Sequence, residues 1–388
     1  MDNARCEHEG CGGCLYRDVP YEGQLAIKDG ELRRLMDGSG IDCGEYLGIA
    51  ASPALYAYRN KMDYSFGDER KGGEITLGMH RRGRFMSVMT TDGCLLVDGD
   101  FNAILAAALR FAREKGYAAY NRKSRCGLLR NLVIRRGART RRILVNLVCS
   151  SQGCVDGDAF VERLLSLGLG GGIDGILLTV NDRPADFVYC DELRTLYGNS
   201  FYFEEMLGLR FKVGAFSFFQ TNVEAVERLC ETVFSWMPPL DGKTVFDLYC
   251  GAGVITQALA KRAGRAVGIE ISGEAVGAAR ENAAANGLAN CSFIEGDVLE
   301  RIDALAGERP DFVVLDPPRA GVHPKALEKI AGLRADALLY ISCNPKSMME
   351  NLRAMNGLYG VKCVQAFDNF PFTGHTEAAA LLELRRQN

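Results

Sequence analysis

Five side chains that can take part in chemistry follow one another at regular intervals in the C-terminal half of the chain. They are the four acids and one cysteine at the ends of five apolar runs: Asp247, Glu270, Asp297, Asp316 and Cys343. The intervals of 23, 27, 19 and 27 residues are each about one strand–helix unit. A single acid at such a position is commonly a helix cap or a solvated turn. Four acids and a thiol at one sheet edge indicate a ligand crevice, because ligands bind outside the carboxyl ends of parallel strands.

Two proline-containing motifs present the last two of these side chains. Residues 316–319 read DPPR and residues 342–345 read SCNP. The prolines end the preceding strands and stiffen the loops that hold Asp316 and Cys343. Most cysteines are small buried apolar residues, but a cysteine in a rigid loop at the ligand edge is typical of a reactive thiol. We therefore expect Cys343 to be reactive.

The turn after the first apolar run, DLYCGAGVIT at 247–256, is typical of a nucleotide cofactor site. Gly251 and Gly253 let the backbone approach a ligand where a side chain would clash, and Glu270 is placed to hydrogen-bond a ribose diol. NAD and S-adenosylmethionine sites share both features. Thr256 replaces the third glycine of the GxGxxG dinucleotide pattern, so a pyrophosphate fits less well. The turn therefore favours S-adenosylmethionine over NAD.

The elements that must position these residues alternate between strand and helix. From Thr244 onward, near-continuous apolar runs are separated by helical patterns such as 272–287, and this alternation predicts a parallel, doubly wound sheet. The run TEAAALLELR near the C-terminus is expected to add a final strand. Upstream we expect mostly strands, with helices at 21–36 and 101–116. The strand-like runs there include 75–79, 143–150 and 175–180.

Composition narrows the class of protein. The chain has 388 residues, 47% hydrophobic and 24% charged, which suggests two or three folded domains and excludes a disordered or fibrous chain. We find no apolar run long enough for a membrane span and no signal peptide. The 14 cysteines are therefore expected to stay reduced in the cytoplasm and, where clustered, to bind metal or to catalyse.

Basic residues are concentrated in one segment. Residues 55–145 contain 19 Lys and Arg against 8 Asp and Glu, whereas the rest of the chain is acidic. Such asymmetry indicates a polyanion-binding portion, although a solvated basic face would also explain it. The candidate phosphate contacts are Arg59, Lys61, Arg81, Arg82, Arg84, Arg122, Lys123, Arg125, Arg130, Arg135 and Arg136, with Tyr58 and Phe85 interleaved.

Taken in order, seven motifs resemble those of the RNA uracil-C5 methyltransferases, and among them the iron–sulfur-containing 23S rRNA enzymes. They are CEHEGCGGC at 6–14, YRNK at 58–61, FFQTN at 218–222, DLYCGAG at 247–253, DPPRAG at 316–321, SCNP at 342–345 and FPFTGHTE at 370–377. The resemblance covers nearly the whole chain. Many relatives begin with an additional OB-like RNA-binding module, which we expect to be missing here because the sequence starts at the cysteines.

The resemblance implies a covalent mechanism. Carbon 5 of uracil is too weak a nucleophile to attack a methyl sulfonium unaided, and a thiolate that adds to carbon 6 activates it. By analogy Cys343 is that nucleophile, and Glu377, otherwise a surface carboxylate, is the base that removes the carbon-5 proton. Val254 stands where the family often has Asn. The implied cofactor contacts are Gln220, Tyr249, Gly251, Glu270 and Asp316, with Asp297 near the adenine.

The N-terminal cysteines form a candidate metal site. Cys6, Cys11 and Cys14 make a Cx4CxxC motif, and the resemblance points to Cys94 as the fourth ligand. Four thiolates suit either tetrahedral zinc or an iron–sulfur cluster, and spacing does not separate the two. The resemblance implies a 4Fe–4S cluster. Methyl transfer to uracil needs no electron, so we expect a structural role that pins the N-terminal loop to the central domain.

Together these observations predict an α/β protein with four segments. They are a cysteine-rich iron–sulfur loop at 1–14, a helical segment at 15–45 that packs on the catalytic domain, a mainly β central RNA-binding domain at 46–212 and a Rossmann-like S-adenosylmethionine-dependent methyltransferase domain at 213–388. The expected enzyme is a monomeric, cytoplasmic 23S rRNA uridine-5 methyltransferase. A tRNA uridine-5 methyltransferase would share its catalytic residues. An NAD-type oxidoreductase and a non-catalytic metal-cluster RNA-binding protein are the alternatives from other classes.

Overall fold

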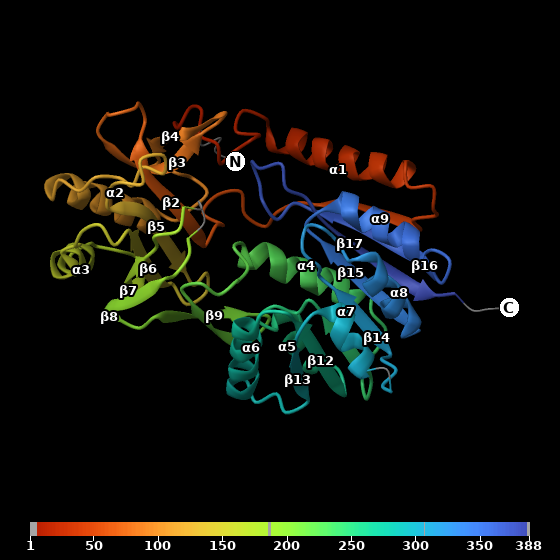
Figure 1. Cartoon of the computed structure of the whole chain (residues 1–388). Helices are drawn as coiled ribbons and strands as arrows, with labels where there is room; N and C mark the ends of the chain where they lie inside the picture. The colour runs from red at the N-terminus through yellow and green to blue at the C-terminus, as the bar shows by residue number, and fades with distance from the viewer. Residues whose placement is uncertain (1–5, 185–187, 306, 386–388) are drawn as a thin grey trace.

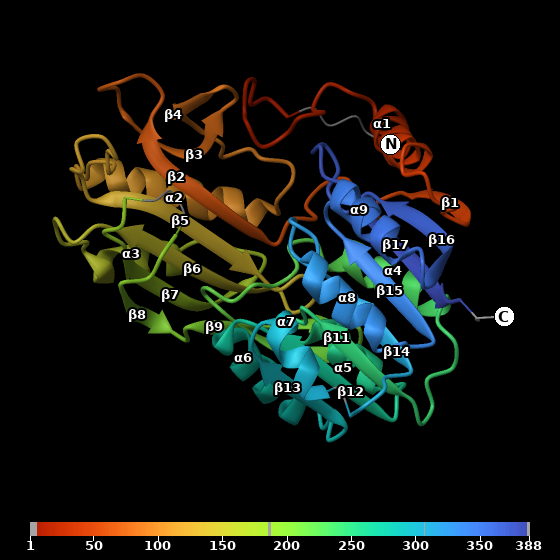
Figure 2. The ribbon, with the colours of Figure 1, turned by 45° about the vertical axis from the view of Figure 1, so that its right-hand side comes forward.

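The computed structural model describes residues 6–184, 188–305 and 307–385 of the chain. Over these residues the chain forms two parts, each built on one β-sheet, with a two-stranded hairpin between them (Figure 1). The second view shows the same two parts with the C-terminal part turned forward (Figure 2). Within the described residues, no helix is long and apolar enough to cross a membrane.

The larger part is built on a sheet of eight described strands, which we call the parallel sheet. Its strands are β1 (Glu45–Ala50), β11 (Thr244–Leu248), β12 (Arg265–Glu270), β13 (Cys291–Glu295), β14 (Phe312–Leu315), β15 (Ala337–Ser342), β16 (Tyr359–Phe367) and β17 (Glu377–Leu384). Their order is β1-β16-β17-β15-β14-β11-β12-β13, and β17 runs antiparallel to both of its neighbours. The apolar runs after Thr244 thus form strands, and the C-terminal run adds a final strand, as the sequence predicts.

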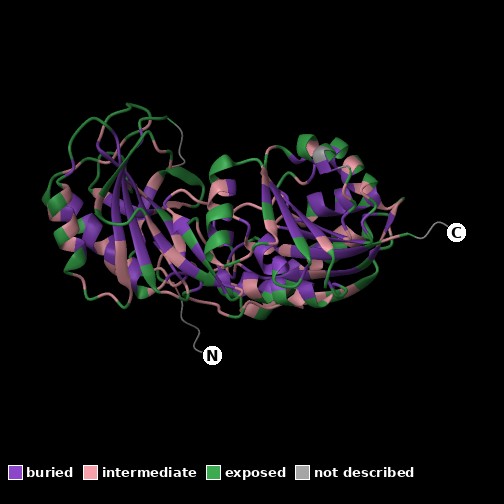
Figure 3. Cartoon of the chain, turned by 90° about the horizontal axis from the view of Figure 1, so that it is seen from below, coloured by how far each residue is buried: buried purple, intermediate pink, exposed green. Residues whose placement is uncertain are grey.

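Helices cover both faces of the parallel sheet, because its strands are buried on both sides. One face carries α4 (Val223–Ser235), α5 (Val254–Ala260) and α6 (Gly273–Ala285), and the other carries α1 (Tyr21–Asp37), α7 (Val298–Arg301), the short 3-10 helix η1 (Ile302–Leu305), α8 (Pro324–Gly332) and α9 (Pro345–Met355). Successive strand residues point to opposite faces, so Val245 packs on the first set of helices and Phe246 on the second. Accordingly, buried residues follow the strands in Figure 3.

Strand β1 and helix α1 belong to this larger part. β1 pairs with β16, whereas the sequence-based boundary at residue 46 put it with the central residues. The strand is short and glycine-flanked, and its partner is more than 300 residues away, so no local pattern assigns it to a sheet. Helix α1 packs on α9, β1 and β16. Lys28 Nζ donates to Asp368 Oδ1 at 2.6 Å with both side chains fully buried, which joins the helical segment to the parallel sheet.

The smaller part is built on a sheet of seven described strands, which we call the mixed sheet. Its strands are β2 (Lys61–Asp68), β3 (Ile75–Arg81), β4 (Arg84–Thr90), β5 (Leu129–Arg136), β6 (Arg142–Cys149), β7 (Gly172–Val180) and β8 (Glu192–Gly198). Their order is β4-β3-β2-β5-β6-β7-β8, and each pair is antiparallel except β6–β7. Helices α2 (Gly99–Glu114) and α3 (Gly157–Leu165) pack on one face. The helix and the strands predicted in this region are present.

A hairpin of β9 (Phe201–Met206) and β10 (Leu209–Gly214) connects the two parts. Strand β9 packs on β6 and β7 of the mixed sheet, and β10 packs on α6 of the larger part. The side-chain oxygens of Asn282 in α6 and of Asn286, which follows this helix, accept hydrogen bonds from the backbone N–H groups of Lys212 and Arg210 at 2.8 and 3.0 Å. The hairpin therefore fixes the mixed sheet relative to the parallel sheet.

Candidate functional site

The carboxyl ends of the parallel strands lie along one edge, and the predicted residues follow the strands there. Glu270 is the last residue of β12, Asp316 comes directly after β14, and Cys343 comes directly after β15. Asp297 follows β13, where its side chain caps α7. Asp247 differs from the others because it lies inside β11 and is buried. Four of the five side chains therefore border the edge itself.

Asp247 combines a structural bond with an unsatisfied acceptor. Its Oδ2 accepts a hydrogen bond of 2.5 Å from Thr256 Oγ1 in α5. Its Oδ1 has no hydrogen-bond partner among the described residues. Burial raises the pKa of Asp247 to about 6, the bonds from Thr256 lower it, and nearby Glu270 raises it. Thr256, the departure from the dinucleotide pattern, thus holds α5 against β11, and one buried oxygen is left for a ligand donor.

Glu270 is held by two backbone N–H groups at the glycine turn. Gly251 N donates to Oε2 at 3.0 Å, and Ser272 N donates to Oε1 at 2.9 Å. A carboxylate oxygen can accept more than one hydrogen bond, so both can still receive ribose hydroxyls. Gly251 has a φ of 53°, and a Cβ built there meets no described atom within 4 Å, so its backbone faces open space. This arrangement fits a nucleoside cofactor.

Tyr249 and Asp297 are brought together at the same turn. Tyr249 has a φ of 72°, which is uncommon for a residue other than glycine. Its backbone N–H donates to the oxygen of Ile269 at 3.0 Å, which ties the turn to β12. Burial, and then the nearby Asp297 carboxylate, raise the pKa of the Tyr249 phenol to about 12. Two of the expected cofactor residues are therefore neighbours.

Gln220 lies in the segment before α4 and not on the parallel sheet. Its backbone oxygen accepts a hydrogen bond of 3.0 Å from Asn60 Nδ2, which ties this segment to the start of β2. Phe218, two residues earlier, is 72% exposed. None of the hydrogen bonds between described residues joins the Gln220 side chain to the other expected cofactor contacts, so its role rests on the resemblance.

Strand β17 brings a second reactive side chain to Cys343. It is antiparallel to β15, with Ser342 opposite Ala378. One step further along this register, Cys343 stands opposite Glu377, the first residue of β17. In a parallel pair, the start of one strand would not meet the end of the other. The reversed strand is therefore what brings the expected nucleophile and the expected base to one place.

The two proline-containing loops are tied to each other beside this pair. Asn344 Nδ2 donates to the backbone oxygen of Arg319 at 2.8 Å, and Ser342 Oγ accepts from Asn344 N at 3.0 Å. Pro345 then begins α9. The positive charge of Arg319 lowers the pKa of the Cys343 thiol. The loops thus hold the thiol against a guanidinium.

Buried acids in the crevice disfavour one another's charge. Burial, and then Asp247, raise the pKa of Asp316 to about 7. Burial, and then Asp316, raise the pKa of Glu377 to about 8, while Arg319 lowers it. Each carboxyl group that ionises here makes the ionisation of the next one less favourable. A positively charged ligand relieves this repulsion, so the crevice suits a sulfonium cofactor.

The surroundings of Cys343 keep its thiol protonated at neutral pH in the free protein. Burial and then Glu377 raise its pKa, Arg319 lowers it by its charge, and Asp316 raises it. Arg319 Nη2 also donates to His375 Nδ1 at 2.9 Å. Burial, and then Arg319, lower the pKa of His375, which keeps its ring neutral. Sequence reasoning missed Arg319 and His375 as site residues, although both lie in motifs that it singled out.

The N-terminal cysteines gather beside the mixed sheet. Cys11 forms a β-bridge with Arg81 at the end of β3. Burial, and then charge on Cys94, Cys11 and Cys6, raise the pKa of the Cys14 thiol to about 12. All fourteen cysteines of the chain are free thiols. The loop that carries three of the four predicted ligands thus lies against the mixed sheet.

The four thiols are not spaced for a single metal ion. In the part of the chain that the structure describes, no three His, Cys, Asp or Glu side chains are close enough to hold one ion. Tetrahedral zinc, with Zn–S bonds of about 2.3 Å, needs sulfur atoms about 4 Å apart. In a 4Fe–4S cluster each thiolate binds a different iron atom, so the sulfur atoms lie further apart. The described residues therefore show no preformed metal site, and the 4Fe–4S cluster stays a prediction.

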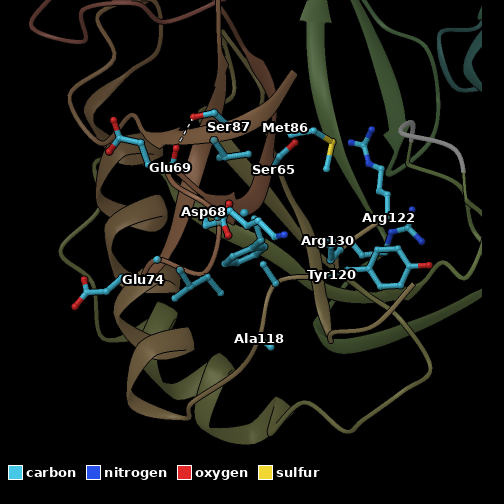
Figure 4. A pocket seen from close by; sticks show the side chains of 18 of the residues that line it. Ser65, Asp68, Glu69, Glu74, Met86, Ser87, Ala118, Tyr120, Arg122 and Arg130 are labelled. Carbon is cyan, nitrogen blue, oxygen red and sulfur yellow. Dashed lines mark hydrogen bonds between the residues drawn. The ribbon is translucent and has the colours of Figure 1, made fainter. Parts of the chain in front are cut away.

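The basic residues of the mixed sheet divide into two groups. Some have carboxylate partners: Arg81 pairs with Glu69, and Arg136 pairs with Asp98 at 2.9 Å. Four line one cavity between β4 and the segment that follows α2 (Figure 4), namely Arg84, Arg122, Lys123 and Arg130, and of these Arg130 Nη1 donates to the backbone oxygen of Asn181 at 2.7 Å.

Three features define the class of the protein. They are a doubly wound sheet with one reversed strand, the glycine turn after β11, and the carboxylates at the carboxyl edge of the sheet. The protein is a Rossmann-like methyltransferase. Residues 206–385 match the family described as tRNA (uracil-5-)-methyltransferase. A protein of Clostridium tetani described as an uncharacterized RNA methyltransferase is 45% identical over 388 residues, which cover 99% of this chain and 84% of that protein. The chain therefore belongs to the RNA uracil-5 methyltransferase family.

Further comparisons agree with this assignment. An RNA methyltransferase of Caldanaerobacter subterraneus is 45% identical over 380 residues, 97% of this chain and 84% of that protein. The solved tRNA (uracil-54, C5)-methyltransferase of Pyrococcus abyssi, in complex with S-adenosyl-L-homocysteine, is 25% identical with a TM-score of 0.80 and covers 96% of this chain and 86% of its own. The expected fold class, the methyltransferase activity and the use of S-adenosylmethionine are confirmed. The oxidoreductase and non-catalytic alternatives are set aside.

Proposed function

We propose that this protein methylates carbon 5 of a uridine through a covalent bond between Cys343 and carbon 6 of the base. The observation that carries the proposal is the register of β15 and β17, in which Cys343 stands opposite Glu377. A nucleophile and a base that act on adjacent carbons of one ring must lie side by side. Arg319, whose charge lowers the pKa of the Cys343 thiol, stabilises the thiolate form.

Each step of this mechanism moves a defined electron pair. The Cys343 thiolate bonds to carbon 6, and the electrons of the C5=C6 double bond pass to the oxygen on carbon 4 as an enolate. The enolate collapses so that carbon 5 takes the methyl group, whose bond to the sulfonium sulfur breaks. Glu377 accepts the proton of carbon 5. The electrons of that C–H bond restore the double bond and expel the thiolate.

Six residues make up the proposed cofactor site, in which S-adenosylmethionine supplies the methyl group. Glu270, whose oxygens border the Gly251 backbone, would accept the ribose hydroxyls. Asp297, beside Tyr249, would lie near the adenine. Gln220 and Asp316 complete the set. The mutual repulsion of the crevice carboxylates supports a cationic ligand.

We propose 23S rRNA as the substrate, because the four N-terminal cysteines follow the pattern of the iron–sulfur-containing rRNA enzymes. A tRNA is the second candidate, since the similar Pyrococcus protein is named for uracil-54 of tRNA. In either RNA the uridine must leave its stack to reach Cys343, which favours a single-stranded loop. The free thiols throughout the chain support a reducing, cytoplasmic location.

We also propose that Cys6, Cys11, Cys14 and Cys94 hold a 4Fe–4S cluster with a structural role. Their loop contacts both parts of the protein: Gly12 N donates to the oxygen of His80, and Tyr16 N to that of Phe372, each at 2.9 Å. A cluster would therefore hold the N-terminal loop against the motif at 370–377, which contains Glu377. Anaerobically purified protein should contain iron and sulfide, and Cys11→Ser should lose both while Cys126→Ser keeps them. Iron-free wild-type protein would contradict the proposal.

Covalent trapping tests the central claim. Protein and S-adenosylmethionine are mixed with 5-fluorouridine-substituted 23S rRNA or tRNA transcripts and run on a denaturing gel. Fluorine on carbon 5 does not leave as a proton, so the Cys343 adduct should persist as a shifted band, and the RNA that gives it is the substrate. Cys343→Ala should give no band. Protein that binds the cofactor but traps neither RNA would overturn the proposed uridine chemistry.

A further inference from the structure

The loop between β16 and β17, residues 368–376, leads directly to Glu377, and we call it the β16–β17 loop. Four consecutive residues in it each have one backbone group bonded to a side chain from a distant part of the chain. The bonds are Asn222 Nδ2 to Asn369 O at 2.7 Å, Lys28 Nζ to Phe370 O at 3.2 Å, the Tyr58 hydroxyl to Pro371 O at 3.0 Å, and Phe372 N to Gln24 Oε1 at 2.7 Å. These side chains come from α1, from the segment before β2 and from the residue that caps α4.

The four side chains are polar and yet buried, since none is more than 7% exposed. A buried polar group is costly unless it is bonded, and here all four form bonds to one loop. A loop that only connects two strands can bond to water at the surface instead. Phe372, within the supported residues, has a φ of 65°, which is uncommon for a residue other than glycine. Such a conformation persists only where the surroundings impose it. The loop therefore has an imposed shape.

The far end of this loop reaches the reactive pair through His375. Arg319 Nη2 lies 2.9 Å from His375 Nδ1. A guanidinium has donors only, so Nδ1 is the acceptor and the ring carries its proton on Nε2. The Phe370 ring packs edge-on against His375, with centroids 6.2 Å apart and planes inclined by 84°. The shape of the loop thus decides where the Arg319 side chain is held.

The charges around these groups make the place of Arg319 important. Burial lowers the pKa of His375, and so do the neighbouring positive charges, which are Arg319, Arg59 and Lys28. The ring therefore stays neutral and can accept from the guanidinium. The charges that act on the Cys343 thiol have both signs: Glu377 and Asp316 raise its pKa, and Arg319 lowers it. If Arg319 moved away, the two carboxylates would act on the thiol without its opposing charge.

We propose that the four buried side chains are positioning residues for methyl transfer. Through the backbone of the β16–β17 loop they place His375, which holds the Arg319 guanidinium beside Cys343. The inference rests on the proposed function for the role of Cys343 as the nucleophile. It also gives the YRNK motif at 58–61 a role inside the protein, because Tyr58 is buried against the loop instead of accompanying phosphate contacts on the surface.

Alkylation of Cys343 by iodoacetamide tests this proposal in the full-length protein without RNA or cofactor. The rate is measured over a range of pH by mass spectrometry of the peptides. The thiolate is the reactive form, so the rate below the pKa follows the fraction of thiolate. Two other cysteines of the same molecule are references. Cys126 is exposed and reports on the reagent, and Cys230 is buried and reports on unfolding.

Tyr58→Phe removes the hydroxyl and keeps the ring, and His375→Leu removes the acceptor. Each should slow the alkylation of Cys343 near pH 7 about 2- to 10-fold, which corresponds to a pKa rise of up to about one unit. The rates should meet that of the wild type at high pH. His375→Asn keeps an acceptor in the place of Nδ1 and should react as the wild type does. In Arg319→Gln protein neither Tyr58→Phe nor His375→Leu should slow the reaction further, because both act through Arg319.

Tyr359→Phe is the matched control. Tyr359 is also buried, and its hydroxyl donates to the backbone oxygen of Ala335 at 3.0 Å, but it is the first residue of β16 and lies at the end away from the loop. This variant should leave the rate at Cys343 unchanged.

Four results would overturn the proposal. They are an unchanged rate at Cys343 in Tyr58→Phe and His375→Leu, an equal slowing in Tyr359→Phe, a further slowing in Arg319→Gln protein, and a reactive Cys230 in Tyr58→Phe, which would mean that the hydroxyl only supports the fold. Alkylation needs no methyl transfer, so the two proposals fail separately. Protein that traps no 5-fluorouridine RNA but shows the expected rates would refute the uridine chemistry and support the placement of Arg319 by the loop.

Discussion

The two sheets of this protein make their sites in opposite ways. In the parallel sheet the crevice results from regularity, because each strand ends at the same edge and Glu270, Asp316 and Cys343 follow directly. In the mixed sheet the cavity results from an irregularity, because β2 leaves β5 after Ser65. Regular pairing thus builds the edge of the parallel sheet, and interrupted pairing builds the cavity of the mixed sheet.

The two sites also differ in charge. The crevice concentrates carboxylates, which raise one another's pKa and attract a small cation. The cavity of the mixed sheet is lined by both signs, because Asp68, Glu69 and Glu74 face it together with the basic side chains named above. The crevice therefore gathers one kind of charge, whereas the cavity contains both.

The strongest test of this division removes the nucleophile from the crevice. Cys343→Ala should lower methyl transfer to RNA on the order of 10⁶-fold, as loss of a catalytic nucleophile does. Binding of S-adenosylmethionine, measured by calorimetry, should stay unchanged. The matched control is Cys291→Ala. Cys291 is the first residue of β13 and so lies at the end of that strand away from the crevice, and this variant should be active. A Cys343→Ala enzyme that still methylates would place the chemistry elsewhere.

The next largest effect should come from the base on the reversed strand. Glu377→Gln should lower turnover about 10²- to 10⁴-fold and accumulate a methylated covalent adduct with unmodified RNA, because the carbon-5 proton has no acceptor. Mass spectrometry of the trapped complex checks both. Glu383→Gln, near the other end of β17 and paired with Lys362 at the surface, should turn over normally. Normal turnover by Glu377→Gln would remove it from the mechanism.

Residues at strand ends were predictable because a strand and its end are local in sequence. Runs such as DFVVLDPP show where the backbone must stop pairing, and so locate Asp316 without knowledge of the rest of the fold. The proximity of Cys343 and Glu377 could not be predicted in this way. It depends on β17 being antiparallel to β15, and only the resemblance to a family implied it before the structure showed that register.

Non-local pairing also explains what the sequence did not reveal. The place of β1 in the parallel sheet depends on a partner more than 300 residues away. The cavity depends on the residue of β2 at which pairing with β5 ends and pairing with β3, on its other side, begins. No residue type marks that point. Arg319 and His375 were visible within motifs, but their contact joins two loops that are distant in sequence. Local chemistry is therefore easier to predict than the contacts that tune it.

A smaller effect is expected for the residue that would hold the ribose. Glu270→Gln replaces one acceptor oxygen by an N–H group that faces a backbone donor, either Gly251 N or Ser272 N. Loss of one charged hydrogen bond should weaken S-adenosylmethionine binding about 10- to 100-fold. Glu295→Gln, on the partner position of β13, is the control and should bind normally. Equal binding by both variants would mean that Glu270 only braces the turn.

The smallest expected effect is a shift in the pH dependence of turnover when Arg319 is replaced. Such a shift would show that the charges in the crevice interact and do not act independently. Glu377 must be ionised to accept a proton, and its pKa is raised to about 8, so turnover should rise with pH about tenfold per unit until that value. Arg319 lowers the pKa of both Glu377 and Cys343. Arg319→Gln should therefore move the profile to higher pH, with a loss at pH 7 that is recovered under alkaline conditions, whereas Arg319→Lys should shift it less. A uniform loss at every pH would show that Arg319 positions the loop and does not set the charge of the pair.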